Sequence, residues 1–120
     1  MNMQQAFDKA YLGVIKQGCI ARDDYGTCAY RYQSGKKLLK CGIGHLLAKK
    51  DYNPEMERKE VRMLADRELL PSNLNRLPTE FLADLQDAHD NVKLFSKTQM
   101  EDFKKNMRVV ADKYDLTVPC

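Results

Sequence analysis

The side chains of this sequence best suited to metal binding or nucleophilic chemistry are four cysteines and two histidines. Cys41 and His45 lie four residues apart, which would place both on one face of a helix. With Cys19 and Cys28 they make a four-ligand set of a kind that tetrahedral zinc accepts. The chain contains no close Cys-x-x-Cys pair, however, and structural zinc sites usually do. We therefore expect packed thiols and no metal, with Cys19, Cys28, Cys41 and His45 as the alternative.

His89 is the other candidate for chemistry. Asp87 and Asp90 are close enough in sequence to orient its ring as a general base. No serine or cysteine nucleophile can be paired with it by spacing, and a histidine at the apolar edge of a helix is more often hydrogen-bonded within the fold. The sequence therefore favours a protein that is not an enzyme. A metal-assisted hydrolase using His89, Asp87 and Asp90 stays as an alternative.

Two glycines, Gly42 and Gly44, follow a probable strand and raise the question of a phosphate-binding loop. The dinucleotide pattern requires a third glycine where this chain has Leu47, and no lysine–serine pair follows. The glycines instead indicate a tight turn that packs closely against a helix. We expect no cofactor.

Charge is distributed unevenly along the chain, although the net charge is only +3. The stretch from Arg31 to Lys50 has six basic residues and no acid, whereas residues 78–91 have four acids and no lysine or arginine. Basic residues among tyrosines suit phosphates or an acidic protein surface, but lysines also protect edge strands from pairing with other chains. The candidate partner-binding residues are Tyr30, Arg31, Tyr32, Lys36, Lys37, Lys40, Lys49 and Lys50.

Periodicity predicts the elements that carry these residues. A helix is expected over 2–18, with a capping box between Asn2 and Gln5 and Gly18 at its end. Residues 19–47 form the hairpin region, with strands over 27–32 and 37–43. Residues 53–115 should form three helices, over 53–70, 78–91 and 96–114, with a loop at 71–77. A capping box is expected between Ser96 and Gln99, and residues 116–120 should form a tail.

The predicted fold class is therefore α+β, with four helices and one β-hairpin between the first and second helix. A length of 120 residues and 43% hydrophobic residues suit a single compact domain over 1–120. No apolar run approaches the roughly 20 residues of a membrane span, and the first residues lack a signal-peptide pattern. We expect no membrane contact, a cytoplasmic location and reduced cysteines.

Several short motifs follow one another along most of the chain. They are Lys16-Gln17-Gly18, Cys28-Ala29-Tyr30-Arg31, Cys41-Gly42-Ile43-Gly44-His45-Leu46, Tyr52-Asn53-Pro54-Glu55-Met56-Glu57 and Leu85-Gln86-Asp87-Ala88-His89-Asp90. Their order resembles that of a group of small bacteriophage and prophage proteins without assigned activity. The chain departs from that group in its basic residues 36–40 and in His45, where the group has apolar or small residues.

The resemblance implies a phage origin and action in the cytoplasm of a host bacterium. Small phage proteins without a recognisable active site commonly bind and inhibit a host protein machine, such as a CRISPR effector or another antiviral defence system. The expected partner is therefore a host protein or complex, which can itself contain nucleic acid, and the oligomeric state stays open. A small nucleic-acid-binding protein that uses the basic hairpin is the alternative.

Overall fold

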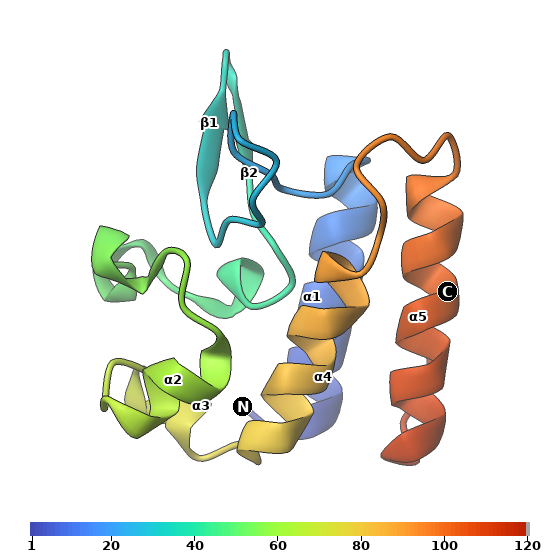
Figure 1. Ribbon diagram of the computed structural model, residues 1–120. Coiled ribbons are helices and arrows are strands. Elements are labelled where there is room, and N and C mark those ends of the chain that lie inside the picture. The colour runs from blue at the N-terminus through green and yellow to red at the C-terminus, as the bar shows by residue number, and fades with distance from the viewer. Residues whose placement is uncertain (120) are drawn as a thin grey trace.

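A computed structural model describes residues 1–119 and shows five α-helices and one two-stranded antiparallel hairpin (Figure 1). The predicted α+β class is confirmed, with one α-helix more than the four expected. None of the helices in the described part of the chain is both long and apolar enough to cross a bilayer.

The first helix, α1 (Met3–Gln17), forms as its sequence predicts. The Asn2 side chain accepts a hydrogen bond from the Gln5 backbone N–H at 2.8 Å, and the Asn2 N–H donates to the Gln5 side chain at 2.9 Å. Gly18 ends the helix in the left-handed region, with φ of 84°. Phe7 and Val14 on its apolar face are fully buried, whereas Met3 and Ile15 are partly buried.

The hairpin is shorter than predicted. Strand β1 (Tyr32–Ser34) pairs with β2 (Lys37–Leu39), and Tyr32 lies opposite Leu39. The expected strands over 27–32 and 37–43 are wrong at their outer ends. Tyr30 turns into the core, and beyond Leu39 the Lys40 backbone N–H donates to the Gln17 side chain instead of the other strand.

The helix expected over 53–70 is broken into pieces. Three single-turn 3-10 helices, η1 (Gly44–Leu46), η2 (Lys49–Asp51) and η3 (Pro54–Met56), precede a short α2 (Val61–Asp66). The Asn53 cap and Pro54 do start η3, but Arg58 then takes a left-handed φ of 64°. The helix ends because the Glu57 carboxylate accepts hydrogen bonds from the backbone N–H groups of Tyr30 and Arg31.

The C-terminal half follows its prediction more closely. α3 (Ser72–Asn75) occupies the expected loop 71–77, and α4 (Thr79–Asp90) and α5 (Gln99–Lys113) match the last two predicted helices. The capping box expected at Ser96 is wrong, since Thr98 is the N-cap and Ser96 bonds to Asp102. The tail is bonded to α1 through Gln4 and Thr117, and Cys120 lies outside the described residues.

Helices α1, α4 and α5 lie side by side and carry most of the core (Figure 1). Phe7, Leu85 and Phe103 are fully buried between them. The hairpin and the three 3-10 helices lie at one side of this helical layer. Functional side chains that lie at the junction therefore come from segments far apart in sequence.

Candidate functional site

The structure does not bring the predicted zinc ligands together. Cys41 is buried and its sulfur accepts a hydrogen bond from the Gly44 N–H at 3.3 Å. The Nε2 atom of His45 is buried without a hydrogen-bond partner in the described residues. Within residues 1–119, the one cluster of possible metal ligands is instead Cys28, His89 and Asp90, whose ligand atoms lie within 4.8 Å of one another.

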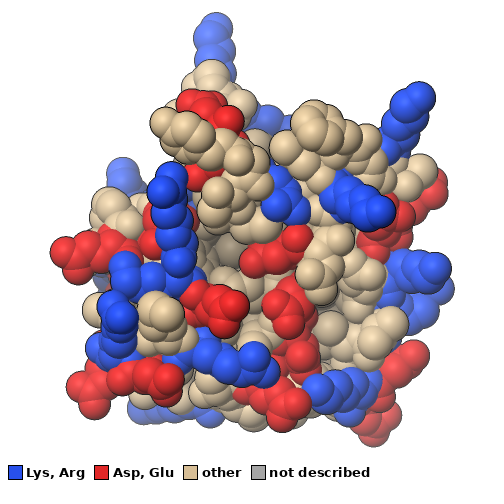
Figure 2. All heavy atoms as spheres, viewed as in Figure 1, with Lys and Arg blue, Asp and Glu red and all other residues tan. Residues whose placement is uncertain are grey.

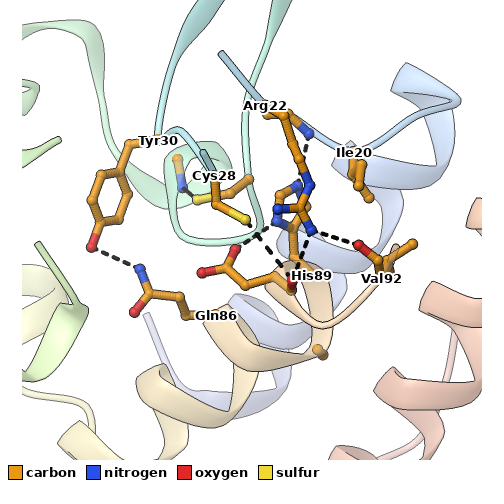
Figure 3. Close-up of polar contacts among 12 residues, drawn as sticks. Ile20, Arg22, Cys28, Tyr30, Gln86, His89 and Val92 are labelled. Atoms are coloured by element: carbon orange, nitrogen blue, oxygen red, sulfur yellow. Dashed lines mark hydrogen bonds and ion pairs between the residues drawn. The ribbon is translucent and has the colours of Figure 1, made fainter. Parts of the chain in front are cut away.

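This cluster has the composition of a cysteine–histidine–aspartate catalytic triad (Figure 3). The His89 ring is completely buried on α4, and its Nδ1 lies 2.8 Å from an Asp90 carboxylate oxygen. Its Nε2 lies 2.8 Å from the backbone nitrogen of Ala21. The expected pairing of His89 with Asp90 is therefore present, whereas Asp87 is exposed.

The backbone N–H of Ala21 determines which ring nitrogen of His89 carries the proton. Because that N–H is a donor, Nε2 must be the acceptor, so the neutral ring is protonated at Nδ1 and donates to Asp90. Neither nitrogen then has a free lone pair for a metal or for accepting a proton from a nucleophile. The hydrogen bonds of His89 thus join α4 to the segment after α1.

The Cys28 thiol is also unsuited to nucleophilic attack. It points toward the backbone carbonyl oxygen of Asp90 at 3.9 Å. Burial, followed by the nearby Asp90 charge, raises the pKa of Cys28 to about 12, so the thiol stays protonated at neutral pH. A pocket of about 170 Å³ opens beside it, lined also by Cys41, Gln86 and Glu60, which is small for a drug-sized ligand.

Tyr30 is not available to a partner. It is only 3% exposed, its hydroxyl donates to the Lys59 carbonyl oxygen at 2.5 Å, and Gln86 donates to the same hydroxyl at 2.8 Å (Figure 3). Gln86 also accepts from the Val61 N–H. The prediction that Tyr30 stacks on a base or contacts a partner is wrong, because its ring is part of the core that joins α4 to α2.

The other predicted partner-binding residues reach the surface to different degrees. Lys36, Lys37, Lys49 and Lys50 are exposed. Lys37 donates to the Gln17 carbonyl oxygen, and the Tyr32 hydroxyl donates to Asp24, so these two side chains are partly engaged. Arg31 and Lys40 are half-buried at the base of the hairpin. The basic residues therefore divide between the hairpin tip, η2 and the hairpin base.

Arg22 is a structural residue that the sequence analysis did not identify. Its guanidinium group donates to the carbonyl oxygens of Gly26, Asp90 and Val92 at 3.1, 2.9 and 2.6 Å (Figure 3). These bonds join the turn at residues 23–27 to the loop between α4 and α5. Gln99 adds a second connection, because it accepts from the Ile20 N–H and donates to the Leu94 carbonyl.

Three large hydrophobic side chains are exposed on these two joined loops. Tyr25 is 85% exposed, Phe95 is 92% exposed and Leu94 is 39% exposed. The loops touch where Leu94 lies against Gly26. We call Tyr25, Leu94 and Phe95 the loop patch. Exposed aromatic side chains on well-connected loops are typical of protein interaction sites.

Charges on the face shown in Figure 2 are interleaved rather than separated. Acidic side chains run through the middle of this face, with basic side chains on both sides. On α4, Glu80 and Asp84 both accept from Lys113 of α5 at 2.9 Å. The α4 acids are thus partly neutralised by α5, as expected for a solvated helix face.

Comparison of the chain with protein-family models, curated proteins and solved structures finds no match.

Proposed function

We propose that this chain is a phage-encoded accessory protein that binds a host protein machine, such as a CRISPR or other antiviral defence system, and inhibits it. The loop patch is the observation that carries the proposal. Two aromatic side chains that are more than four-fifths exposed would cost solvation free energy without a partner that covers them. The phage-like order of motifs supports a host protein as the partner.

Hydrogen bonds within the fold join the two loops of the loop patch, which favours tight binding. Arg22 and Gln99 hold its two loops together through backbone carbonyl and N–H groups. Arg58 lies over the Tyr25 ring, with its guanidinium carbon 5.9 Å from the ring centre. A preordered surface loses less conformational entropy when a partner binds.

The side chains of Cys28, His89 and Asp90 are occupied by contacts within the fold, which supports binding rather than catalysis as the function. Both nitrogens of His89 are occupied by hydrogen bonds within the fold, and the Cys28 thiol is protonated. A catalytic role would require a free base or an ionised nucleophile. The metal-assisted hydrolase is therefore the less favoured alternative.

Pull-down from a nuclease-treated bacterial lysate tests the proposal. The tagged protein should retain one host protein or complex, and the double variant Tyr25→Ser/Phe95→Ser should lose it. Each buried aromatic anchor is worth about 2 kcal/mol, so the double change should weaken binding more than about 100-fold. Val109→Ser is the matched control, because Val109 is an apolar residue of α5 that is 66% exposed and lies outside the loop patch.

Equal recovery by the double variant and the Val109→Ser control would contradict the loop-patch interface. Recovery that disappears on nuclease treatment would favour the nucleic-acid-binding alternative. Alanine at Tyr30 is not a useful test of the interface, since the buried ring would also be lost from the core.

A further inference from the structure

We propose that the pocket beside Cys28 is a binding site for a small organic cation, an ammonium group attached to a compact apolar body. The pocket has a volume of about 170 Å³, and its lining includes Cys28, Tyr30, Glu60, Gln86 and Asp90. We name it the acidic pocket. None of the loop-patch residues lines it, so this site does not depend on the proposed function.

The walls of the acidic pocket suit an apolar ligand body. Cys28 and Cys41 contribute uncharged thiols, since burial raises the pKa of both groups. Ala29 and the Tyr30 ring, both buried, complete the apolar part of the lining. An apolar cavity of about 150 Å³ can hold one benzene molecule, so this pocket has room for a single ring.

Hydrogen bonds within the fold preform the acidic pocket. The Tyr30 hydroxyl donates to the Lys59 carbonyl oxygen at 2.5 Å and accepts from Gln86 at 2.8 Å, and Gln86 accepts from the Val61 N–H at 2.8 Å. Figure 3 shows Tyr30 and Cys28 facing α4 from the segment before β1, with Gln86 reaching toward Tyr30. Three segments distant in sequence are therefore held around one space, as is usual for ligand pockets.

Two carboxylates line the acidic pocket without a cationic partner in residues 1–119. One oxygen of Asp90 accepts from Nδ1 of the neutral His89 ring at 2.8 Å, and the other oxygen makes no hydrogen bond in that part of the chain. Ion pairs there involve Asp23, Glu80, Asp84 and the His89–Asp90 contact, and Glu60 forms none. Both carboxylates can therefore accept from a bound ammonium group.

The two basic residues of the lining have their charged groups engaged outside the pocket. The Lys59 ammonium group donates to the Glu55 carbonyl oxygen. The Arg58 guanidinium lies 3.7 Å from the Asp23 carboxylate and 5.9 Å from the centre of the Tyr25 ring. Glu55, Asp23 and Tyr25 are not part of the lining. The uncompensated charge at the pocket is therefore negative.

The surface and the set of nearby ligand atoms favour an organic cation over a metal ion. Figure 2 shows acidic side chains around a hollow in the middle of the face, between the hairpin and α4. Within residues 1–119, Glu60 belongs to no group of three close metal ligands, and both nitrogens of His89 are occupied. A metal ion would also leave the ring-sized apolar walls uncovered.

Benzylammonium is the probe for this site, and benzyl alcohol, which has a similar size and no charge, is its comparison ligand. At pH 7 and constant ionic strength, the wild type should bind benzylammonium at least about tenfold more tightly, because its hydrogen bonds to carboxylates are charge-assisted. Titration followed by heteronuclear NMR measures both affinities. The largest shifts should fall in residues 27–30, 58–60 and 86–90, which contain most of the lining.

Variants of the two carboxylates test their assigned role. Glu60→Gln and Asp90→Asn should each weaken benzylammonium binding at least about fivefold and leave benzyl alcohol binding unchanged. Both should fold, since Glu60 is exposed and Asp90→Asn keeps an oxygen that can accept from His89. Glu101→Gln is the matched control, because it removes the same charge from an exposed position on α5 outside the pocket.

Three outcomes would overturn the proposal. Equal affinities for benzylammonium and benzyl alcohol would show an apolar cavity with no preference for a cation. A loss of benzylammonium affinity in Glu101→Gln as large as that in Glu60→Gln would show a general attraction of cations to the surface. Shifts in the wild type no larger than those caused by sodium chloride would show that the pocket does not bind the probe.

Discussion

At the scale of single residues, buried polar side chains connect segments that are distant in sequence. His89 joins α4 to the segment after α1, Glu57 joins the 3-10 helices to the hairpin, and Arg22 joins two loops. The closeness of His89 to Asp90 could be predicted because the two are adjacent in sequence. The approach of Cys28 and Ala21 to His89 could not, since only the tertiary fold brings them there.

Replacing His89 should reveal the hydrogen bonds assigned to it. His89→Leu has a similar volume but leaves the buried Ala21 N–H without an acceptor, so the free energy of unfolding should fall by about 2–3 kcal/mol. Asp90→Asn keeps an oxygen that can accept from Nδ1 and should cost about 1 kcal/mol or less. Urea denaturation measures both, and equal losses in the two variants would contradict the assigned proton position.

His45 should make stability depend on pH. Burial lowers its folded-state pKa to about 4, below the ordinary value of 6.5, so between these pH values the unfolded chain binds a proton that the folded chain does not. The stability present above pH 6.5 is therefore lost as pH falls toward 4. Partial exposure of the ring reduces the effect to about 2 kcal/mol.

The pH effect is measured as a difference between two proteins. The free energy of unfolding should be measured for the wild type and for His45→Gln between pH 7 and pH 4. The wild type should lose about 2 kcal/mol more than the variant over this range, because the variant has no imidazole at position 45 to titrate. Parallel curves would show that the imidazole titrates normally in the folded protein.

At the scale of elements, local signals predicted both ends of the first helix, whereas the helix expected over 53–70 was wrong beyond its start. The Asn2–Gln5 capping box and the Asn53–Pro54 start are both present. The helix after Pro54 ends early because Glu57 accepts hydrogen bonds from the backbone of Tyr30 and Arg31, which lie 27 and 26 positions away in sequence. Sequence periodicity cannot report such a contact, so that segment was predicted as one long helix.

Gly42, just before η1, and Gly44, its first residue, should differ strongly in their tolerance of a methyl group. A Cβ on Gly44 would lie 2.0 Å from the Tyr30 carbonyl oxygen, whereas on Gly42 its nearest neighbour is the Leu85 carbonyl oxygen at 3.5 Å. Gly44→Ala should therefore lower the free energy of unfolding by about 3 kcal/mol or more, and Gly42→Ala by about 1 kcal/mol or less. Unfolding in guanidinium chloride measures both variants. Similar losses of unfolding free energy would contradict the close approach of residue 44 to the Tyr30 carbonyl oxygen.

At the scale of the whole molecule, a layer of three long helices supports a less regular half. Helices α1, α4 and α5 bury their aromatic and aliphatic side chains against one another. The sequence predicted these helices correctly because each has a continuous apolar face. It did not predict the loop patch, since Leu94 and Phe95 have the composition of a core segment and only the fold shows that they are exposed.

Hydrogen exchange should show this division. Residues 48–59 contain two single-turn helices and bury only Met56, so their amides should exchange by local opening, much faster than the central amides of α1, α4 and α5. Glu57→Ala should accelerate exchange in residues 48–59 and leave the three long helices nearly unchanged. Equal protection from hydrogen exchange in residues 48–59 and in the three long helices would contradict this prediction.

The hydrogen bonds of Arg22 have a consequence for any attempt to copy or block the loop patch. Its two halves are separated by about 70 positions in sequence and are joined through backbone carbonyl groups that only the folded chain brings together. A synthetic peptide covering residues 91–98 would therefore be a poor competitor, and antibodies raised against that peptide would miss the native surface. An effective mimic would need to carry both loops, with an arginine or a covalent link between them.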